Sequence, residues 1–272
     1  MALTAFQRDV CRLLAGQRKL SGESYVAGGA ALNEILKAPR LSRDLDLFHD
    51  SQQGLDAAWQ ADRALLLARG YEVRVDRDRP GFVEAEIRLQ AESVIIQWTR
   101  DSAYRFFPLV EHEELGLTMH PFDLATNKVL ALVGRLEVRD FIDAIACDEK
   151  VQPLGYLAWA ACGKDPGFSP LAILEQAARS GHHAAAEFSG LDFEGTPPDP
   201  AALSQRWRLI LESARQILDR LPAEQAGKAV LTKDGELFRG RLEELTSATA
   251  DGRLVYHTGT IRGAFPLLAR LG

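Results

Sequence analysis

Two glycines, Gly28 and Gly29, stand between a short apolar run and a helical pattern, and they constrain the fold most strongly. Residues 24–27 predict a strand and residues 29–37 a helix, because glycine permits the sharp turn between them. A second strand is predicted over residues 45–48, after a polar turn. The order strand, glycine turn, helix, strand indicates an α/β unit. Further strand-like runs extend this unit at residues 71–75, 82–89 and 93–98.

Helical patterns replace strand patterns from Pro121 onward, with helices expected over residues 122–147, 154–162, 170–180 and 200–221. Residues 190–200 are rich in Gly and Pro and are typical of a surface linker. We therefore predict the α+β class, with a mixed β-sheet flanked by helices and a mainly helical C-terminal part. The predicted domains are an α/β core at 1–120, a helical region completing the active-site cleft at 121–221, and a small appendage at 222–272.

Composition narrows the class of protein further. The 272 residues are 46% hydrophobic and 26% charged, enough apolar material for one large domain or two small ones. A net charge of -6 argues against a long nucleic-acid surface, although it allows a local basic pocket. The 3 cysteines contain no C-x-x-C pair, which argues against a disulfide framework or a zinc cluster. No apolar run approaches the roughly 20 residues of a membrane helix, and no signal peptide is evident, so we expect a cytoplasmic protein without membrane contact.

Asp44 and Asp46 are the strongest candidates for chemistry. They alternate with Leu45 and Leu47 on the second predicted strand, so both carboxylates should lie on one side while the leucines anchor the strand in the core. Two neighbouring anions repel each other unless a cation lies between them. Hard oxygen ligands in this arrangement favour Mg²⁺, which commonly completes its shell with water and substrate phosphates.

The glycines supply a complementary phosphate site. Without side chains they let the backbone approach a phosphate, and the following helix offers free N–H groups and a positive dipole end. A lone Gly-Gly is usually a turn, and a lone D-x-D motif is usually a solvated acidic pair. Together, in strand-helix-strand order, they favour a metal and triphosphate site.

Two sequence blocks resemble the nucleotidyltransferase superfamily, and within it the AbiEii-type toxin nucleotidyltransferases. The first comprises YVAGGAAL at residues 25–32 and RLSRDLDLF at residues 40–48. The second comprises DLATNK at residues 123–128 and RDFID at residues 139–143. The resemblance spans residues 20–150, and the blocks are jointly more specific than either alone.

The resemblance implies Mg²⁺-dependent transfer of a nucleoside monophosphate from an NTP to an acceptor hydroxyl. It also implies a toxin-like role, with a tRNA 3′ end or another nucleic acid or protein hydroxyl as acceptor and a cognate antitoxin as partner. The implied metal ligands are Asp44 and Asp46, and the implied catalytic residues add Lys128 and Asp140 to these. The implied NTP-binding residues are Gly28, Gly29, Ser42, Arg43, Lys128, Arg135 and Arg139, with Asp143 and Gln97 in supporting positions.

The second block also has a helical interpretation of its own. At about 100° per residue, Lys128, Arg135, Arg139 and Asp143 fall within roughly 80° of one another on the helix predicted over residues 122–147. On an isolated helix, such a charged stripe is more often a solvent-exposed face on which Arg139 and Asp143 form an ion pair. Beside a triphosphate site, Lys128 and Arg135 would instead neutralise phosphate charge. Asp140 or Asp143 would orient a basic side chain or the attacking hydroxyl.

Gln97 departs from the superfamily pattern. Many nucleotidyltransferases carry a third carboxylate on a neighbouring strand, and Gln97 occupies the position that looks equivalent. An amide cannot serve as an anionic base. The sequence leaves three possibilities: the enzyme works with two carboxylates, Glu86 or Asp101 takes the place of the third, or the chemistry is impaired.

Two other functions remain open from the sequence. One is nucleotide transfer to a small molecule such as an aminoglycoside-like antibiotic, which an acidic acceptor pocket would favour because such substrates are polycationic. The other is a non-catalytic NTP-binding or interaction protein in which Gln97 marks lost chemistry. The role of residues 153–272 is open as well, with capping of the sheet as the default interpretation.

Overall fold

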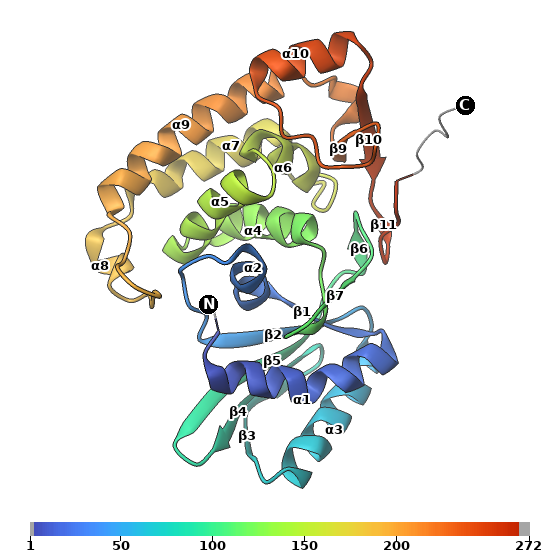
Figure 1. The fold of residues 1–272 in the computed structure, drawn as a ribbon, viewed down its shortest axis with the longest axis vertical. Helices are drawn as coiled ribbons and strands as arrows, with labels where there is room; N and C mark the ends of the chain where they lie inside the picture. Colours follow the sequence, from blue (N-terminus) through green and yellow to red (C-terminus); the bar gives the residue numbers. More distant parts are fainter. Residues whose placement is uncertain (1–2, 267–272) are drawn as a thin grey trace. The chain divides into compact units, whose positions relative to one another are not determined.

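A computed structural model describes residues 3–266 of the chain, apart from the side chains of His182 and Ala185. The chain forms two compact units (Figure 1). Unit 1 comprises residues 1–103, 108–120 and 192–195, and unit 2 the remainder. The three-domain division at residues 120 and 221 stays a prediction, and the last six residues of its appendage lie outside the described part. Over residues 3–266, no helix combines the length and apolar character needed to cross a bilayer.

Unit 1 is built on a seven-stranded mixed sheet with the order β3-β4-β5-β2-β1-β8-β7. The central strand β2 pairs in parallel with β5 and antiparallel with β1, and β1 pairs in parallel with β8. The sheet confirms the predicted mixed α+β class. Its strands are β1 (Ser24–Ala27), β2 (Asp44–His49), β3 (Glu72–Arg79), β4 (Phe82–Leu89), β5 (Glu92–Arg100), β7 (Val110–His112) and β8 (Gly116–Thr118). Its helices are α1 (Ala5–Ser21), α2 (Gly28–Leu36) and α3 (Gln52–Ala68).

The two faces of this sheet differ in character. Leu45 and Leu47 of β2 are each 1% exposed, and they share the buried face with Ile96 and Trp98 of β5. Helices α1 and α3 pack on that face, while α2 lies on the other side of β1 and β2 (Figure 1). Alternation along β2 therefore directs Asp44 and the other even-numbered residues away from α1 and α3, as the period of two predicts.

Asp62 is a buried carboxyl on α3 that makes the stability of the protein depend on pH. Its side chain accepts a hydrogen bond from Trp98 Nε1 at 2.9 Å, and burial raises its pKa to about 6. A raised carboxyl pKa means that the folded state favours the protonated form. Its stabilising contribution is therefore fully present below the ordinary pKa of 3.8 and is lost as the pH rises through about 6.

We expect Asp62→Asn to be more stable than the wild type at pH 8 by about 2–3 kcal/mol, with little difference at pH 4. The amide resembles the protonated carboxyl and still accepts the Trp98 hydrogen bond, but it does not ionise. Urea denaturation of both proteins at the two pH values measures the difference. Asp56→Asn, an exposed change on the same helix, should alter stability by less than about 0.5 kcal/mol at either pH. If Asp62→Asn raised stability equally at both pH values, the raised pKa of Asp62 would be contradicted.

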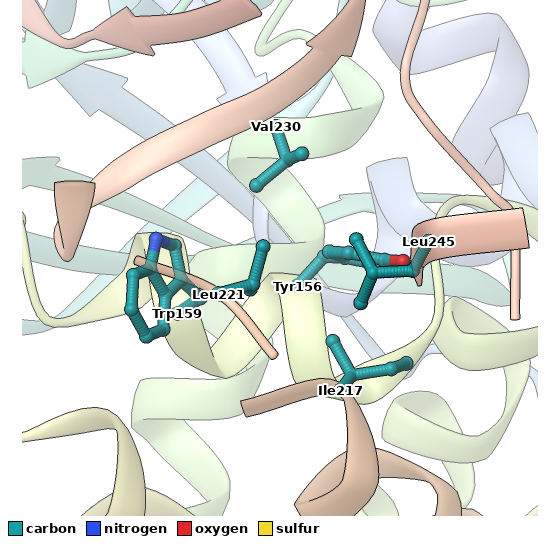
Figure 2. Close-up of a cluster of buried hydrophobic side chains, with 6 residues drawn as sticks. All are labelled: Tyr156, Trp159, Ile217, Leu221, Val230 and Leu245. Carbon is teal, nitrogen blue, oxygen red and sulfur yellow. The ribbon is translucent and has the colours of Figure 1, made fainter. Parts of the chain in front are cut away.

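Unit 2 is mainly helical, and its core surrounds α6 (Leu154–Ala161), all of whose residues are buried. Figure 2 shows one buried cluster in which Tyr156 and Trp159 of α6 meet side chains from three other elements. The Tyr156 hydroxyl donates to the backbone oxygen of Gly240 at 2.7 Å, which ties the last part of the chain to this core. The other members of the cluster are Ile217, Leu221, Val230 and Leu245.

The remaining elements of unit 2 surround this core. Its longer helices are α4 (Pro121–Arg135), α5 (Val138–Lys150), α7 (Pro170–Ala178), α9 (Pro200–Leu218) and α10 (Leu242–Ala250). Its short helices are η1 (Arg179–His182), α8 (Ala185–Phe188) and η2 (Ala223–Gln225). Its strands form two separate pairs, β9 (Lys228–Thr232) with β10 (Leu254–Thr258) and β6 (Tyr104–Arg105) with β11 (Thr260–Ile261).

The single helix predicted over residues 122–147 is wrong. The structure forms two helices there, α4 and α5, and the chain turns between them at Leu136, which has a φ of 54°. A left-handed residue cannot continue a right-handed helix. Glu137 then serves as the N-cap of α5. The predicted stripe of Lys128, Arg135, Arg139 and Asp143 along one helix therefore does not exist.

Residues 190–199 lie outside helices and strands and none of them is buried, in agreement with the predicted surface linker, but part of this segment has a defined place in the fold. Residues 192–195 belong to unit 1, where they run alongside the loop that precedes β2. Phe193 forms an isolated antiparallel bridge with Arg40, and the backbone N–H of Leu41 donates to Asp192 at 2.9 Å. These backbone hydrogen bonds explain why a Gly- and Pro-rich segment is held in a defined conformation.

Candidate functional site

The predicted site residues fall into two sets, one in each compact unit. The set in unit 1 contains Gly28, Gly29, Ser42, Arg43, Asp44, Asp46 and Gln97. The set in unit 2 contains Lys128, Arg135, Arg139, Asp140 and Asp143.

Asp44 and Asp46 lie two residues apart on β2 and share its open face. Both are half-buried, whereas the leucines between and beyond them are fully buried. Ser42 Oγ donates to Asp44 Oδ1 at 3.2 Å, and the backbone oxygen of Ser42 accepts from Gln7 Nε2 at 2.8 Å. The loop before β2 is therefore fixed by α1, and it in turn fixes one of the two carboxylates.

Gly28 lies directly against the carboxylate of Asp46. A Cβ on Gly28 would be 1.7 Å from Asp46 Oδ2, and the backbone there has a φ of 66°. Gly28 is also the first residue of α2, and the N-cap Ala27 supplies no side-chain cap to this helix. The Asp46 carboxylate thus lies at the positive end of a helix to which its N-cap residue contributes no side-chain hydrogen bond.

Gly29 is adjacent to a residue that the sequence analysis missed. A Cβ on Gly29 would be 2.6 Å from Arg40 Nη2, and Arg40 is 5% exposed. The second glycine therefore makes room for a buried guanidinium at the start of α2. Arg43, by contrast, is largely exposed and its Nε pairs with Asp192 Oδ2 at 2.6 Å. Its assignment as an NTP-binding residue stays a prediction.

Gly28→Ala tests the close approach of the glycine turn to Asp46. We expect a loss of stability of at least about 1–2 kcal/mol, because alanine is strained at positive φ and its methyl group would displace the carboxylate. Urea denaturation measures the loss.

Gly16→Ala is the matched control, since Gly16 lies inside α1 and a Cβ there would meet nothing within 4 Å. It should raise stability by about 0.5–1 kcal/mol, because alanine has the higher helix propensity. If both substitutions shift stability in the same direction, the close approach of Gly28 to Asp46 is refuted.

Gln97 lies beside Asp46 and is anchored from the other side by Glu84. The register pairs Asp46 with Gln97 and Gln97 with Glu84, so the three share one row on the open face of β2, β5 and β4. Gln97 Nε2 donates to Glu84 Oε2 at 2.8 Å. Of the two residues considered as replacements for a third carboxylate, Glu86 pairs with Ile95 in the neighbouring row, and Asp101 lies beyond the end of β5. The pairing of β4 with β5 therefore places Glu84, and not Glu86, opposite Gln97.

The residues of unit 1 fit a magnesium ion that keeps most of its ligands from water and substrate. Asp44 and Asp46 supply two carboxylates on one face, and oxygen ligands of this kind suit Mg²⁺. Among residues 3–266 there is no group of three or more His, Cys, Asp or Glu side chains arranged to hold a metal. The pair would therefore hold Mg²⁺ with the help of phosphate oxygens, which is usual for this ion.

Lys128 and Asp140 form the centre of the unit 2 set. Lys128 Nζ, on α4, lies 2.8 Å from Asp140 Oδ1 and 3.1 Å from Asp143 Oδ2, both on α5. Arg135 Nε lies 2.5 Å from Asp140 Oδ2. Both aspartates are fully buried and Lys128 is 7% exposed, whereas the Arg135 side chain is 43% exposed. The structure thus brings together four of the five predicted residues.

Asp140 acts as the shared anion of this cluster. Burial by itself raises the pKa of a carboxyl, but the hydrogen bond from Arg135 and the charge of Lys128 outweigh it and lower the pKa of Asp140. Arg139 is the exception, because its Nε pairs with Glu137 Oε2 at 2.6 Å rather than with Asp143. The Arg139–Asp143 pair considered from helical periodicity is therefore wrong: both residues lie on α5, but Asp143 is buried and pairs with Lys128 instead.

The first residue of the second sequence block has a structural role. Asp123 is fully buried and accepts hydrogen bonds from the backbone N–H groups of Phe106 and Phe107, at 2.8 and 3.0 Å. It also pairs with Lys164 Nζ at 2.8 Å. Phe106 and Phe107 are buried in the core of unit 2.

Comparisons with known proteins support the fold. The sequence matches no protein-family model and none of the curated proteins. A solved structure named as a candidate nucleotidyltransferase from H. pylori has 14% identity and a TM-score of 0.51, and the match covers 80% of this chain and 97% of that one. JHP933 from Helicobacter pylori has 12% identity and a TM-score of 0.52, with 78% and 91% covered.

A third structure, the nucleotidyltransferase toxin MenT4 from Mycobacterium tuberculosis H37Rv, has 17% identity and a TM-score of 0.49, with 79% and 86% covered. This likeness is too weak to support an argument about function. The first two show that the chain has the fold found in the candidate nucleotidyltransferase, which confirms the predicted resemblance at the level of the fold.

Proposed function

We propose that this protein is a nucleotidyltransferase that moves a nucleoside monophosphate from an NTP to an acceptor hydroxyl. One observation carries the proposal: Asp44 and Asp46 share the open face of β2, and Asp46 lies against Gly28 at the start of α2. Acidic metal ligands and a phosphate-binding helix end are thereby adjacent. The shared fold is compatible with this chemistry but does not identify a substrate.

The reaction needs positioning and charge neutralisation rather than a protein nucleophile. The acceptor oxygen forms a bond to the α-phosphorus, the bond from that phosphorus to the β-phosphate oxygen breaks, and pyrophosphate leaves. The acceptor's proton is released to solvent. The N–H groups at the start of α2 bind phosphate oxygens, and Gly28 and Gly29 leave the space that this approach needs.

Asp44 and Asp46 would hold the magnesium ion. When bound, Mg²⁺ neutralises phosphate charge and orients the phosphate oxygens. Ser42 keeps Asp44 in position through the hydrogen bond to its carboxylate. Arg40, buried beside Gly29, adds positive charge near the phosphate-binding turn.

The unit 2 cluster combines two cations with two buried carboxylates. Asp140 and Asp143 already balance the charge of Lys128, which is buried between them. Arg135 is the accessible cation of the cluster, and Asp140 orients its guanidinium. We therefore propose that Lys128 keeps Asp140 and Asp143 in place, while Arg135 stays a predicted NTP-binding residue.

The proposed acceptor is the 3′ end of a tRNA or a similar nucleic-acid hydroxyl. The net charge of -6 suits contact limited to an end better than contact along an RNA surface. The sequence resemblance to toxin nucleotidyltransferases supports a toxin role with a cognate antitoxin.

The experiment is label transfer from each of the four NTPs, labelled at the α-phosphate, in the presence of Mg²⁺. Acceptors are total tRNA, an aminoglycoside, and the protein alone, with pyrophosphate release measured in parallel. Label on tRNA supports the proposal as stated. Label on the aminoglycoside would show that the acceptor is a small molecule and not a nucleic acid. NTP binding without transfer to any acceptor would contradict the enzymatic function.

A further inference from the structure

Asp46, Gln97 and Glu84 occupy one row across three adjacent strands. Strands in a sheet lie about 4.8 Å apart, and side chains in the same row share a face. Gln97 is therefore in the middle, with Asp46 on one side and Glu84 on the other. The row continues to β3, where Arg77 pairs with Glu84 and places its Nε 3.4 Å from Glu84 Oε1.

The hydrogen bond from Gln97 to Glu84 determines which way the amide faces. An ionised carboxylate only accepts hydrogen bonds, so the NH₂ group of Gln97 must be the end that meets Glu84. Gln97 Nε2 donates to Glu84 Oε2 at 2.8 Å. Within residues 3–266, no other protein group hydrogen-bonds to the Gln97 side chain. Its carbonyl oxygen, Oε1, is therefore available at the end of the amide turned away from Glu84.

Charge balance favours a neutral oxygen at this position. Asp44 and Asp46 together carry the two negative charges that match one divalent cation. A carboxylate in place of Gln97 would add a third negative charge within the same row, and repulsion would raise the cost of placing it there. The Glu84 charge, one strand farther away, is partly balanced by Arg77.

We propose that Glu84 is a positioning residue: it holds the Gln97 amide so that Oε1 faces the Asp46 side of the row and serves as a neutral ligand of the divalent cation. The inference rests on the proposed function, because it concerns the same metal site. It assigns that site a single cation, held by two carboxylates and one amide oxygen. Gln97 is then a working replacement for the missing third carboxylate.

The test measures metal binding rather than activity, with Mn²⁺ as a spin-active substitute for Mg²⁺ in titrations followed by electron paramagnetic resonance. In the full-length protein, Glu84→Gln is expected to weaken Mn²⁺ binding about tenfold, because partners that orient metal ligands typically have effects of this size. Glu86→Gln is the matched control on the same strand and face, with the same change in charge. It should change the Kd less than twofold.

A double-mutant cycle separates positioning from general electrostatics. If Glu84 acts through Gln97, Glu84→Gln should have no further effect on Mn²⁺ affinity in a Gln97→Ala background. Equal effects of Glu84→Gln and Glu86→Gln would overturn the inference, as would a full effect of Glu84→Gln without Gln97. Circular dichroism and thermal melting establish that each variant is folded.

The wild type and Asp46→Asn distinguish this inference from the function on which it rests. If the wild type binds Mn²⁺ no better than Asp46→Asn does, the metal site of the proposed function fails, and the inference fails with it. If Asp46→Asn removes binding while Glu84→Gln does not weaken it, only the role of Glu84 is refuted.

Discussion

Transfer of the nucleoside monophosphate is expected to fall at least about a thousandfold in an Asp46→Asn variant. Asparagine keeps the shape of the side chain but removes the charge that binds the metal, and a metal ion contributes several kcal/mol of transition-state stabilisation. A loss of about 4 kcal/mol corresponds to a factor of about a thousand in rate. The measurement is single-turnover transfer from the α-labelled NTP that the wild type uses.

Folding should be preserved in this variant. Asp46 is half-buried beside Asp44, and removing one of two neighbouring negative charges relieves their repulsion. We therefore expect thermal melting close to that of the wild type. Asp78→Asn, the same chemical change at an exposed position of β3, is the matched control and should retain full activity. Retention of more than a tenth of wild-type transfer by Asp46→Asn would refute its role as a metal ligand.

Asp140→Asn should cause the largest loss of stability among single substitutions in the unit 2 set, about 3 kcal/mol. Its carboxylate is fully buried and pairs with both Lys128 and Arg135. Removing one member of a buried ion pair leaves the remaining charge poorly compensated, which typically costs about 3–5 kcal/mol. Part of that cost is avoided because Asp143 still pairs with Lys128. Urea denaturation at pH 7 measures the difference.

The loss should depend on pH in a defined direction. Because the pKa of Asp140 is lowered in the folded state, its contribution to stability is present above the ordinary value of 3.8 and disappears as the pH falls through the lowered value. The difference between wild type and variant should therefore shrink in strong acid.

Glu137→Gln is the control for Asp140→Asn, since Glu137 pairs with Arg139 at the start of the same helix but is 43% exposed. Exposed pairs contribute little, so we expect a change below about 1 kcal/mol. Equal destabilisation by the two substitutions would show that Asp140 is not the buried centre of the cluster.

Local patterns in the sequence were sufficient to predict the centre of unit 1. The strand at residues 24–27, the glycine turn and the second strand follow from alternation and from the conformational freedom of glycine. The same rules placed Asp44 and Asp46 on one face. Each of these inferences depends only on residues close together in the chain, so no knowledge of distant partners was needed.

The position of Glu84 shows where local patterns stop being sufficient. The strand-like runs at 82–89 and 93–98 leave a three-residue connection at 90–92, which would pair Leu89 with Ser93 and set Ala85 opposite Gln97. The structure pairs Leu89 with Glu92, so the turn is one residue shorter and Glu84 takes that place. Because side chains alternate between faces, a register shift of one residue exchanges the residues on each face.

The sequence by itself therefore determined the fold class, the glycine turn and the shared face of the two aspartates, because period and turn chemistry are properties of short segments. Only the tertiary structure decided that the helical segment breaks at Leu136, that Lys128 pairs with Asp140 and Asp143, and that residues 192–195 join unit 1. These features arise from ion pairs and backbone hydrogen bonds between segments that come together only when the chain folds, and helical periodicity contains no information about them.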